Sequence, residues 1–467
     1  MRLSEKQINR RCRGKFEMRS GLDVVRLRCK VFAIPLARSA RSGVCQMNCK
    51  TYFQFVFGFL ILSPVANCQI ATSAQAASAA AASAGLPTPS GPYSIGRQGY
   101  DLTDRSRADP FSSRQDGHRK LMVYIWYPVQ HTKGQSTGEY VPRAHQLDNN
   151  ADAKAAARNE FGPRWPLIVS GSITSHAIAN ALPVAHAGKF PVILFSHGIS
   201  DTTFSYTAQI EDFVSHGYVV VAIEHTDAAG VVLFPDNQIR LYHAVPAPSP
   251  VPKDPLQAMI ASAQTGAQIG AEDVRFVLNE LAEGTIPVAQ VMDLNRVAAV
   301  GHSYGGTLTA RACQLDSRIK ACISEDGEVN PVGVYFDYPD QASFQQPFLF
   351  LEIDWRPTDD MLARMHESRS QWEQYMAHER QQLNTCKPGS YHVLLQGQGM
   401  THASFSDGLL LSAIPGSPEA SKALNNLLLT ATVERSFLDK VLKREPVPLL
   451  DLAAKTPPDV KIEPVGR

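Results

Sequence analysis

Ser303 lies in the pentapeptide Gly301-His-Ser-Tyr-Gly305, where its hydroxyl could act as a nucleophile. Gly-x-Ser-x-Gly is the pattern of a nucleophile elbow, a sharp turn between a strand and a helix that exposes the serine side chain. Such a turn strains the backbone and leaves room only for small residues two positions away, which the two glycines provide. Residues 297–300 are apolar and predict a buried strand, and residues 307–315 predict the following helix. The sequence therefore predicts Ser303 as a nucleophile.

A serine hydroxyl is a weak nucleophile, so it needs a general base and an acid that orients the base. In folds with this elbow the chain order is serine, acid, histidine. His402 lies in a glycine-containing loop after the last predicted strand, and we predict that it is the base. Asp326 and Asp354 each follow a predicted strand; the generic order favours the later one, but the residues alone leave both open as the acid. The other downstream histidines fall in a charged helix or inside a strand: His366, His378 and His392.

Ester chemistry at a serine also needs two backbone N–H groups that bind the developing oxyanion. The elbow supplies one from the residue after the nucleophile, which is Tyr304. The second is expected from the turn after another strand, where Ile199 follows Gly198. We expect Ser196 and His197 to brace that turn rather than to contact substrate.

The elements around these residues alternate between strands and helices. Alternation of this kind predicts a mostly parallel sheet with helices on both faces, and the candidate residues all follow strands, where ligands bind in such sheets. We place the first strand at an edge because Pro128 ends it. The predicted strands cover residues 119–128, 189–198, 218–225, 297–300, 319–324, 347–353 and 391–396, and the predicted helices 203–216, 254–281, 307–315, 358–382 and 422–442. Residues 130–185 read as irregular, with an Ala-rich helical piece.

Five sequence blocks in order resemble the secreted platelet-activating-factor acetylhydrolase family of α/β-hydrolases, with similarity over residues 91–445. The resemblance implies the α/β-hydrolase fold and selects Asp326 over Asp354 as the acid, beside His402 and the N–H groups of Ile199 and Tyr304. Glu325, Glu328 and the long polar helix over residues 358–382 depart from the family pattern. The blocks are Gly91-Pro-Tyr-Ser-Ile-Gly96, Phe195-Ser-His-Gly198, residues 215–227, residues 301–306 and Thr401-His-Ala-Ser-Phe-Ser-Asp407.

The same resemblance implies calcium-independent hydrolysis of short or oxidised sn-2 acyl esters of phospholipids through an acyl-enzyme. Parts of the pattern are shared with general esterases, polyesterases and dienelactone hydrolases, which are the alternative within enzymes. A non-catalytic binding protein on a hydrolase scaffold is the alternative from another class. We expect a small-molecule ester or phospholipid as the partner, with a peripheral lipid-surface contact, and the sequence gives no oligomeric state.

Charge and cysteine usage exclude other classes of function. Residues 1–50 contain 13 Lys or Arg against 3 Asp or Glu, and the rest of the chain contains 32 against 41. An acidic body does not favour nucleic-acid binding. No C-x-x-C or Cys/His cluster is present in the sequence, so we expect no metal and no cofactor. Of the cysteines after the leader, Cys313 and Cys322 are expected to fill core positions without bonding to each other, and Cys386 is the third.

The beginning of the chain reads as a targeting segment. Residues 52–62 form an apolar run that is too short to span a bilayer and is typical of a signal peptide. We expect translation to start at Met47 or Met18, and export to the periplasm or the medium, with a membrane tether at the N-terminal segment as an alternative. Cys68 follows a sequence like a lipoprotein cleavage box, although Asn67 stands where a small residue is expected.

The sequence predicts four consecutive parts. A basic, signal-peptide-like leader covers residues 1–68, and an Ala/Ser/Pro-rich linker covers residues 69–90. The catalytic domain is expected over residues 91–445, followed by a C-terminal tail over residues 446–467.

Overall fold

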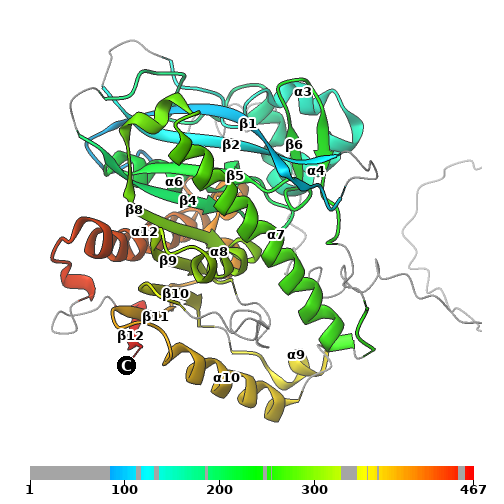
Figure 1. Ribbon diagram of the computed structural model, residues 1–467, viewed down its shortest axis with the longest axis vertical. Coiled ribbons are helices and arrows are strands. Elements are labelled where there is room, and N and C mark those ends of the chain that lie inside the picture. Colours follow the sequence, from blue (N-terminus) through cyan, green and yellow to red (C-terminus); the bar gives the residue numbers. More distant parts are fainter. Residues whose placement is uncertain are drawn as a thin grey trace, which may run out of the picture. The chain divides into compact units, whose positions relative to one another are not determined.

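The fold is given by a computed structural model (Figure 1). It describes residues 85–111, 117–130, 136–184, 188–245, 250–253, 255–327, 344–354, 356–364, 368–450 and 458–466. All of these residues belong to one compact unit, Tyr52–Arg467. The predicted leader, its start codon, Cys68 and most of the linker lie outside the described residues, as do Glu328 and His366.

A ten-stranded sheet forms the centre of this unit, in the order β12-β11-β10-β9-β8-β4-β5-β2-β1-β3. In this order, all neighbouring strands from β11 to β5 pair in parallel. β12 pairs antiparallel to β11, and β2 pairs antiparallel to β5. The sheet is therefore mostly parallel, as predicted. The strands are β1 Ser94–Ala108, β2 His118–Val129, β3 Ile178–Ala179, β4 Phe190–Ser196, β5 Val219–Glu224, β8 Met292–His302, β9 Ile319–Glu325, β10 Phe348–Ile353, β11 Ser390–Leu395 and β12 Val460–Val465.

Helices cover both faces of the sheet. Successive residues of a strand point to opposite faces, so each face has its own apolar side chains against which helices pack. Ile193 and Phe195 of β4 pack in one apolar cluster with residues of α6 and α12, whereas Val192 and Leu194 pack in another with residues of α7 and α8 (Figure 1). The helices are α3 Ala144–Asp148, α4 Ala151–Phe161, α5 Trp165–Val169, α6 Thr207–Ser215, α7 Pro255–Glu283, α8 Tyr304–Leu315, α9 Asp359–Arg364, α10 Arg369–Leu383, α11 Gly408–Ser412 and α12 Pro418–Leu438. A separate hairpin joins β6 Val231–Leu233 to β7 Ile239–Leu241.

One predicted strand lies at a different place in the sheet, and three strands of the sheet, β1, β3 and β12, were not predicted. The prediction that residues 119–128 form an edge strand is wrong, because β2 lies between β5 and the long strand β1. β1 was not predicted because polar and charged residues fill it, and much of its length is exposed at alternate positions. Residues 460–465, expected in the tail, form β12 beside β11. The predicted helix over residues 358–382 corresponds to α9 and α10.

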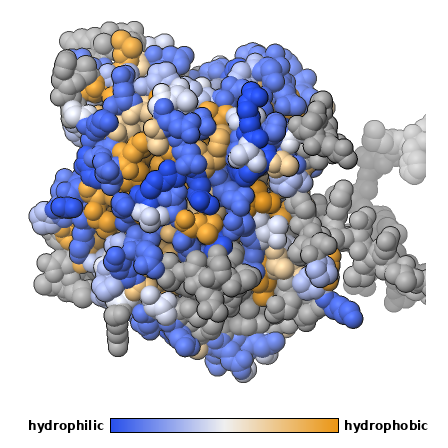
Figure 2. Space-filling model, in the orientation of Figure 1, coloured by the Kyte–Doolittle hydropathy of each residue, from blue (hydrophilic) through white to orange (hydrophobic). Residues whose placement is uncertain are grey.

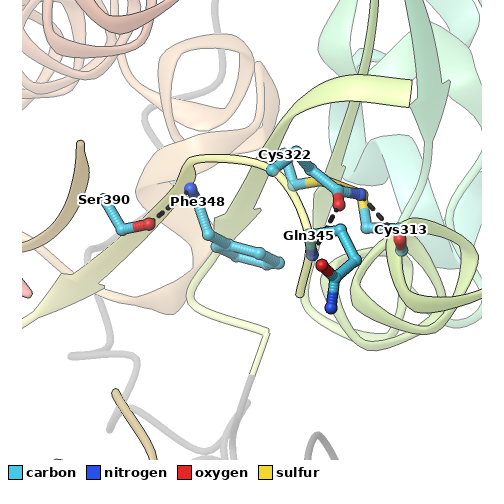
Figure 3. The surroundings of a disulfide bond; sticks show 6 residues. Cys313, Cys322, Gln345, Phe348 and Ser390 are labelled. Atoms are coloured by element: carbon cyan, nitrogen blue, oxygen red, sulfur yellow. Dashed lines mark hydrogen bonds between the residues drawn. A yellow bond between two sulfur atoms is a disulfide. The ribbon is translucent and has the colours of Figure 1, made fainter. Parts of the chain in front are cut away.

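The prediction that Cys313 and Cys322 remain unbonded is wrong, since they form a disulfide. The short turn between α8 and β9 brings the two Cα atoms to 6.5 Å, within the usual range for a disulfide. Both cysteines are nevertheless buried, and Gln346 Nε2 donates a 2.6 Å hydrogen bond to the Cys313 carbonyl. Figure 3 shows the bond close to β10, where the Phe348 N–H donates to Ser390 Oγ at 2.9 Å.

The disulfide is expected to stabilise the protein because it closes a loop in the unfolded chain. Replacing both partners in Cys313→Ala/Cys322→Ala should lower the free energy of unfolding by about 2–3 kcal/mol. Urea unfolding of oxidised and reduced protein measures this. A reducing agent should destabilise the parent protein and leave the double variant unchanged. Equal stability of the oxidised parent and the double variant would contradict the prediction.

Candidate active site

Ser303 stands at the turn between β8 and α8 with φ 55° and ψ −125°, a backbone conformation that a non-glycine residue adopts only under strain. A Cβ added at Gly301 would overlap the backbone of Gly305, and a Cβ at Gly305 would overlap the Ser196 carbonyl. The elbow is therefore possible only with these glycines. The Ser303 N–H donates a 2.9 Å hydrogen bond to the Glu325 carbonyl, which ties the elbow to the end of β9.

The structure brings Ser303, His402 and Asp326 together. His402 Nε2 lies 2.9 Å from Ser303 Oγ, and His402 Nδ1 lies 2.6 Å from Asp326 Oδ2. Asp326 follows β9 with φ 48°, and its other carboxylate oxygen accepts a hydrogen bond from the Ile353 N–H at 3.2 Å. His402 begins a short 3₁₀ turn, His402–Phe405, whose capping residue is Thr401. The loops that follow β8, β9 and β11 thus meet at the carboxyl ends of these strands.

Asp354 lies away from this cluster. Its carboxylate accepts hydrogen bonds from Arg356, at 2.8 Å from Nη2, and from Gln396 Nε2, also at 2.8 Å. These two donors hold the pKa of Asp354 below its usual range. His392 is likewise occupied elsewhere, with Nε2 2.9 Å from Glu352 Oε2. Of the two acids that the residues left open, the structure places Asp326 against the histidine.

The turn after β4, which carries Ile199, is fixed by hydrogen bonds on both sides of Gly198. The Gly198 N–H donates to Tyr206 Oη at 3.1 Å, and its carbonyl accepts from His197 Nδ1 at 2.7 Å. His197 Nε2 in turn accepts from the His225 N–H at 3.1 Å. These partners require the neutral Nδ1–H tautomer, which agrees with the burial that lowers the pKa of His197 to about 3. His197 braces the turn, as the sequence predicted.

Tyr304 is the first residue of α8, at the position from which an elbow directs its N–H toward an oxyanion. Tyr304 and Ile199 line the same cavity, together with Thr226 just after β5, Leu308 of α8 and residues of α7. The cavity volume is about 10 Å³, roughly the space that one water molecule needs. Ile199 and Tyr304, which carry the two predicted N–H donors, therefore border one small cavity, which Ser303 and His402 do not line.

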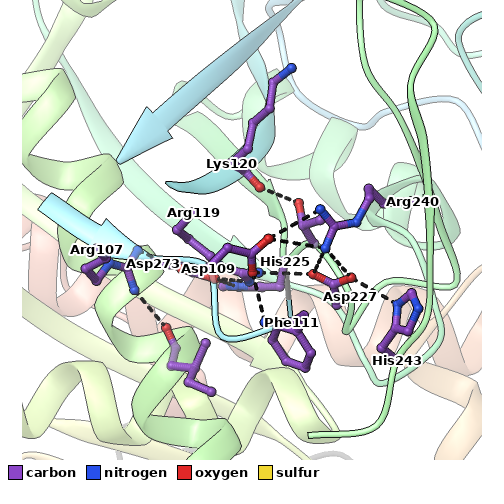
Figure 4. A network of polar contacts seen from close by, with 12 residues as sticks. Arg107, Asp109, Phe111, Arg119, Lys120, His225, Asp227, Arg240, His243 and Asp273 are labelled. Carbon is purple, nitrogen blue, oxygen red and sulfur yellow. Dashed lines mark hydrogen bonds and ion pairs between the residues drawn. The ribbon is translucent and has the colours of Figure 1, made fainter. Parts of the chain in front are cut away.

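A network of buried ion pairs, shown in Figure 4, contributes Arg119, His225 and Asp273 to the wall of this cavity, and it was not predicted from the sequence. Arg119, which is almost fully buried, is 2.8 Å from Asp273 and 3.3 Å from Asp227. These carboxylates raise the pKa of Arg119 against the opposite effect of burial, and Arg119 lowers the pKa of Asp273. His225 joins the network to β4, since its Nδ1 lies 3.1 Å from Asp273 Oδ2 and its Nε2 3.0 Å from Ser196 Oγ.

The ion pairs connect segments that are far apart in sequence. Arg107 of β1 contacts Asp273 of α7 at 2.8 Å, and Arg240 of β7 contacts Asp227 at 2.8 Å. Breaking one partner of a buried pair typically costs about 3–5 kcal/mol, because it leaves an uncompensated charge. The network therefore fixes β1, β7 and α7 around the cavity. Among the described residues, no group of three or more His, Cys, Asp or Glu has the arrangement of a metal site.

A strand-elbow-helix unit at the centre of a mostly parallel sheet is the arrangement of α/β-hydrolases. The model of the alpha/beta hydrolase family matches residues 193–446, more than half of the chain, and the chain belongs to this family. A second family model, described as platelet-activating factor acetylhydrolase, isoform II, matches residues 78–239. The resemblance to that family is therefore confirmed.

Curated relatives carry names of the same kind. The chain is 27% identical over 258 residues to a probable 1-alkyl-2-acetylglycerophosphocholine esterase of Arthroderma benhamiae, covering 52% of this chain and 58% of that protein. It is 26% identical over 292 residues to the platelet-activating factor acetylhydrolase of Cavia porcellus, covering 58% and 61%. The aligned part thus spans about three fifths of these relatives' length.

A solved structure is similar over most of the chain. The ferulic acid esterase from Streptomyces cinnamoneus matches with a TM-score of 0.59 and 25% sequence identity, covering 81% of this chain and 98% of that chain. This chain therefore shares its fold with nearly the whole of that solved chain.

Proposed function

We propose that this protein is a serine carboxylic-ester hydrolase with Ser303 as nucleophile, His402 as general base and Asp326 as the acid that orients it. The single observation that carries the proposal is the contact of His402 with both partners, at 2.9 Å from Ser303 Oγ and 2.6 Å from Asp326 Oδ2. Both distances are within hydrogen-bond reach, as base and nucleophile require. The names of the relatives, two esterases and an acetylhydrolase, support the same class of reaction.

The proposed reaction has two halves. As Ser303 Oγ attacks the ester carbonyl carbon, His402 Nε2 takes its proton, and ionised Asp326 stabilises the imidazolium at Nδ1. The carbonyl oxygen becomes an oxyanion and accepts hydrogen bonds from the N–H groups of Ile199 and Tyr304. His402 then gives the proton to the oxygen of the leaving alcohol. The alcohol departs, and the acyl group remains bonded to Ser303 as an acyl-enzyme. Water attacks the acyl group with His402 again as base, and the acid product and free Ser303 result.

The substrate class that we propose is phospholipids with short or oxidised sn-2 acyl chains, hydrolysed without calcium. Two observations support it: the match to the acetylhydrolase family over residues 78–239 and the name of the Cavia porcellus relative, platelet-activating factor acetylhydrolase.

A chain-length series tests this substrate class. Phosphatidylcholines with acetyl, butanoyl, hexanoyl or palmitoyl at sn-2 are presented in detergent micelles at one mole fraction, with EGTA present. We expect kcat/KM to fall by about tenfold or more from acetyl to palmitoyl. Methyl ferulate serves as the comparison ester because of the structural relative. If it is hydrolysed faster than every phosphatidylcholine, the general-esterase alternative holds and the phospholipid assignment is wrong.

We also propose that the protein is exported. The Cys313–Cys322 disulfide supports this, because structural disulfides persist in oxidising compartments. In the part of the chain that the structure describes, no helix has the length and apolarity to cross a bilayer. On the face in Figure 2, hydrophilic side chains surround separate apolar patches. A contact with lipid surfaces stays a prediction from the sequence. N-terminal sequencing of the mature protein tests export, and a mature chain that retains Arg10 and Arg11 would contradict it.

A further inference from the structure

A chain of three polar side chains joins the loop of His402 to the turn after β4. His302 Nε2 lies 2.9 Å from the His402 carbonyl oxygen, and His302 Nδ1 lies 2.8 Å from Tyr206 Oη. Tyr206 Oη is also 2.7 Å from Asp201 Oδ2 and accepts the 3.1 Å hydrogen bond from the Gly198 N–H. Tyr206 and His302 are buried, and Asp201 is partly buried. We refer to Asp201, Tyr206 and His302 as the polar chain.

Counting hydrogen atoms shows that the polar chain needs an additional proton. A carbonyl oxygen only accepts, so His302 Nε2 carries a hydrogen, and a neutral His302 then has a bare Nδ1. Tyr206 has one hydroxyl hydrogen, but its oxygen lies between that Nδ1 and a carboxylate, and both are acceptors. One hydrogen cannot serve both contacts. Both are hydrogen bonds only if one further proton is present, on Asp201 or on His302 Nδ1.

The surroundings favour Asp201 as the holder of this proton. Burial raises the pKa of Asp201, against smaller opposite effects of the hydrogen bond with Tyr206 and of the positive form of His402. Asp201 also interacts electrostatically with the carboxyls of Glu160 on α4 and Glu224 on β5. Burial and His402 together lower the pKa of His302, and burial with Asp201 and Glu325 keeps the Tyr206 hydroxyl protonated by raising its pKa. The hydrogen bonds then run from the Asp201 carboxyl through Tyr206 and His302 to the His402 carbonyl.

We propose that Tyr206 is a positioning residue that fixes the His402 loop relative to the oxyanion turn, and that it does so only while the polar chain holds this shared proton. The inference rests on the proposed roles of His402 and Ile199. Tyr206 reaches the first through His302 and the second through Gly198, the residue before Ile199. When the proton leaves at alkaline pH, the Tyr206 hydrogen can serve either Asp201 or His302, so one contact breaks and the alignment loosens.

Two substitutions test the role of the Tyr206 hydroxyl and the role of the shared proton separately. Tyr206→Phe removes the hydroxyl and keeps the ring, and should lower kcat/KM by about 10- to 100-fold, as expected for misplaced catalytic groups. Asp201→Asn supplies a permanent N–H in place of the titrating O–H. Its kcat/KM at neutral pH should be at least about tenfold above that of Tyr206→Phe, and the alkaline fall in kcat/KM should disappear or move to higher pH. Tyr127→Phe, which removes another buried tyrosine hydroxyl bonded to the Ala181 carbonyl, is the matched control and should behave as the parent protein.

A second readout needs no turnover and therefore separates a failure of this inference from a failure of the proposed function. The ¹⁵N resonances of the His302 imidazole should shift in the parent protein over the same alkaline range and stay constant in Asp201→Asn. The inference is overturned if the shift or the alkaline fall persists in Asp201→Asn over the same pH range as in the parent protein, or if this variant loses as much activity as Tyr206→Phe. Equal losses in Tyr206→Phe and Tyr127→Phe would also overturn it.

Discussion

Replacing Ser303 with alanine is expected to lower kcat/KM for p-nitrophenyl acetate by at least about 10⁴-fold while the protein stays folded. The substitution removes the only atom that forms the acyl bond in the proposed mechanism. His402 and Asp326 would remain 2.6 Å apart, but without Ser303 Oγ the imidazole has no proton to take. Steady-state hydrolysis measured at several enzyme concentrations gives the residual rate.

Two controls make the result specific. Thermal unfolding should show Ser303→Ala folded, because removing one hydroxyl leaves the elbow and its glycines in place. Ser436→Ala removes a hydroxyl that donates only to the Thr432 carbonyl within α12, so its activity should equal that of the parent protein. A Ser303→Ala variant that is folded and retains more than about a tenth of the activity would contradict the assignment.

Asp326→Asn is expected to lower kcat by about 10⁴-fold, because an amide in place of the carboxylate no longer fixes the productive tautomer of His402 or stabilises its charged form. The geometry of the site should be preserved, since the asparagine keeps the shape of the aspartate and can still accept the Ile353 N–H. The same hydrolysis assay measures kcat, and circular dichroism checks the fold.

Asp354→Asn is the matched control for Asp326→Asn. Its carboxylate contacts Arg356 and Gln396 and does not contact His402, so kcat should change by no more than about twofold. The reverse pattern, with a large loss in Asp354→Asn and a small one in Asp326→Asn, would show that the acid has been assigned wrongly.

The parts of the fold that could be predicted are those buried on both faces. β4, β5 and β8 are buried through most or all of their length and read as continuous apolar runs. β1 could not be recognised, because polar and charged residues fill it and its exposed positions leave no continuous apolar run. β12 is a six-residue strand that becomes visible only through its pairing with β11.

Local sequence motifs predicted only those parts of the site that are formed by residues adjacent in sequence. Ser303 and the expected oxyanion donors follow from the composition of two turns. The choice between Asp326 and Asp354 could not follow from composition, since both come directly after an apolar strand. It depends on the loop after β9, where Asp326 turns back with a positive φ and meets His402. The resemblance to a known family selected Asp326, and the residues alone did not.

Contacts between distant segments were also invisible. The Cys313–Cys322 bond depends on how the turn between α8 and β9 closes, and nine residues of separation do not reveal it. Arg107, Arg119 and Asp273 are separated by many elements and meet only because β1, β2 and α7 lie together beside the cavity (Figure 4). Such pairs carry no periodic signal in the sequence.

Peptide mapping after reaction with a fluorophosphonate tests the central claim most directly, because the reagent forms a bond only with a serine that a neighbouring base activates. The mature protein is labelled, digested and analysed by mass spectrometry, with His402→Ala as the comparison. We expect one modified peptide, carrying the label on Ser303, loss of esterase activity in proportion to labelling, and almost no labelling of His402→Ala. Full labelling at a different serine, or complete inactivation with Ser303 unmodified, would contradict the account.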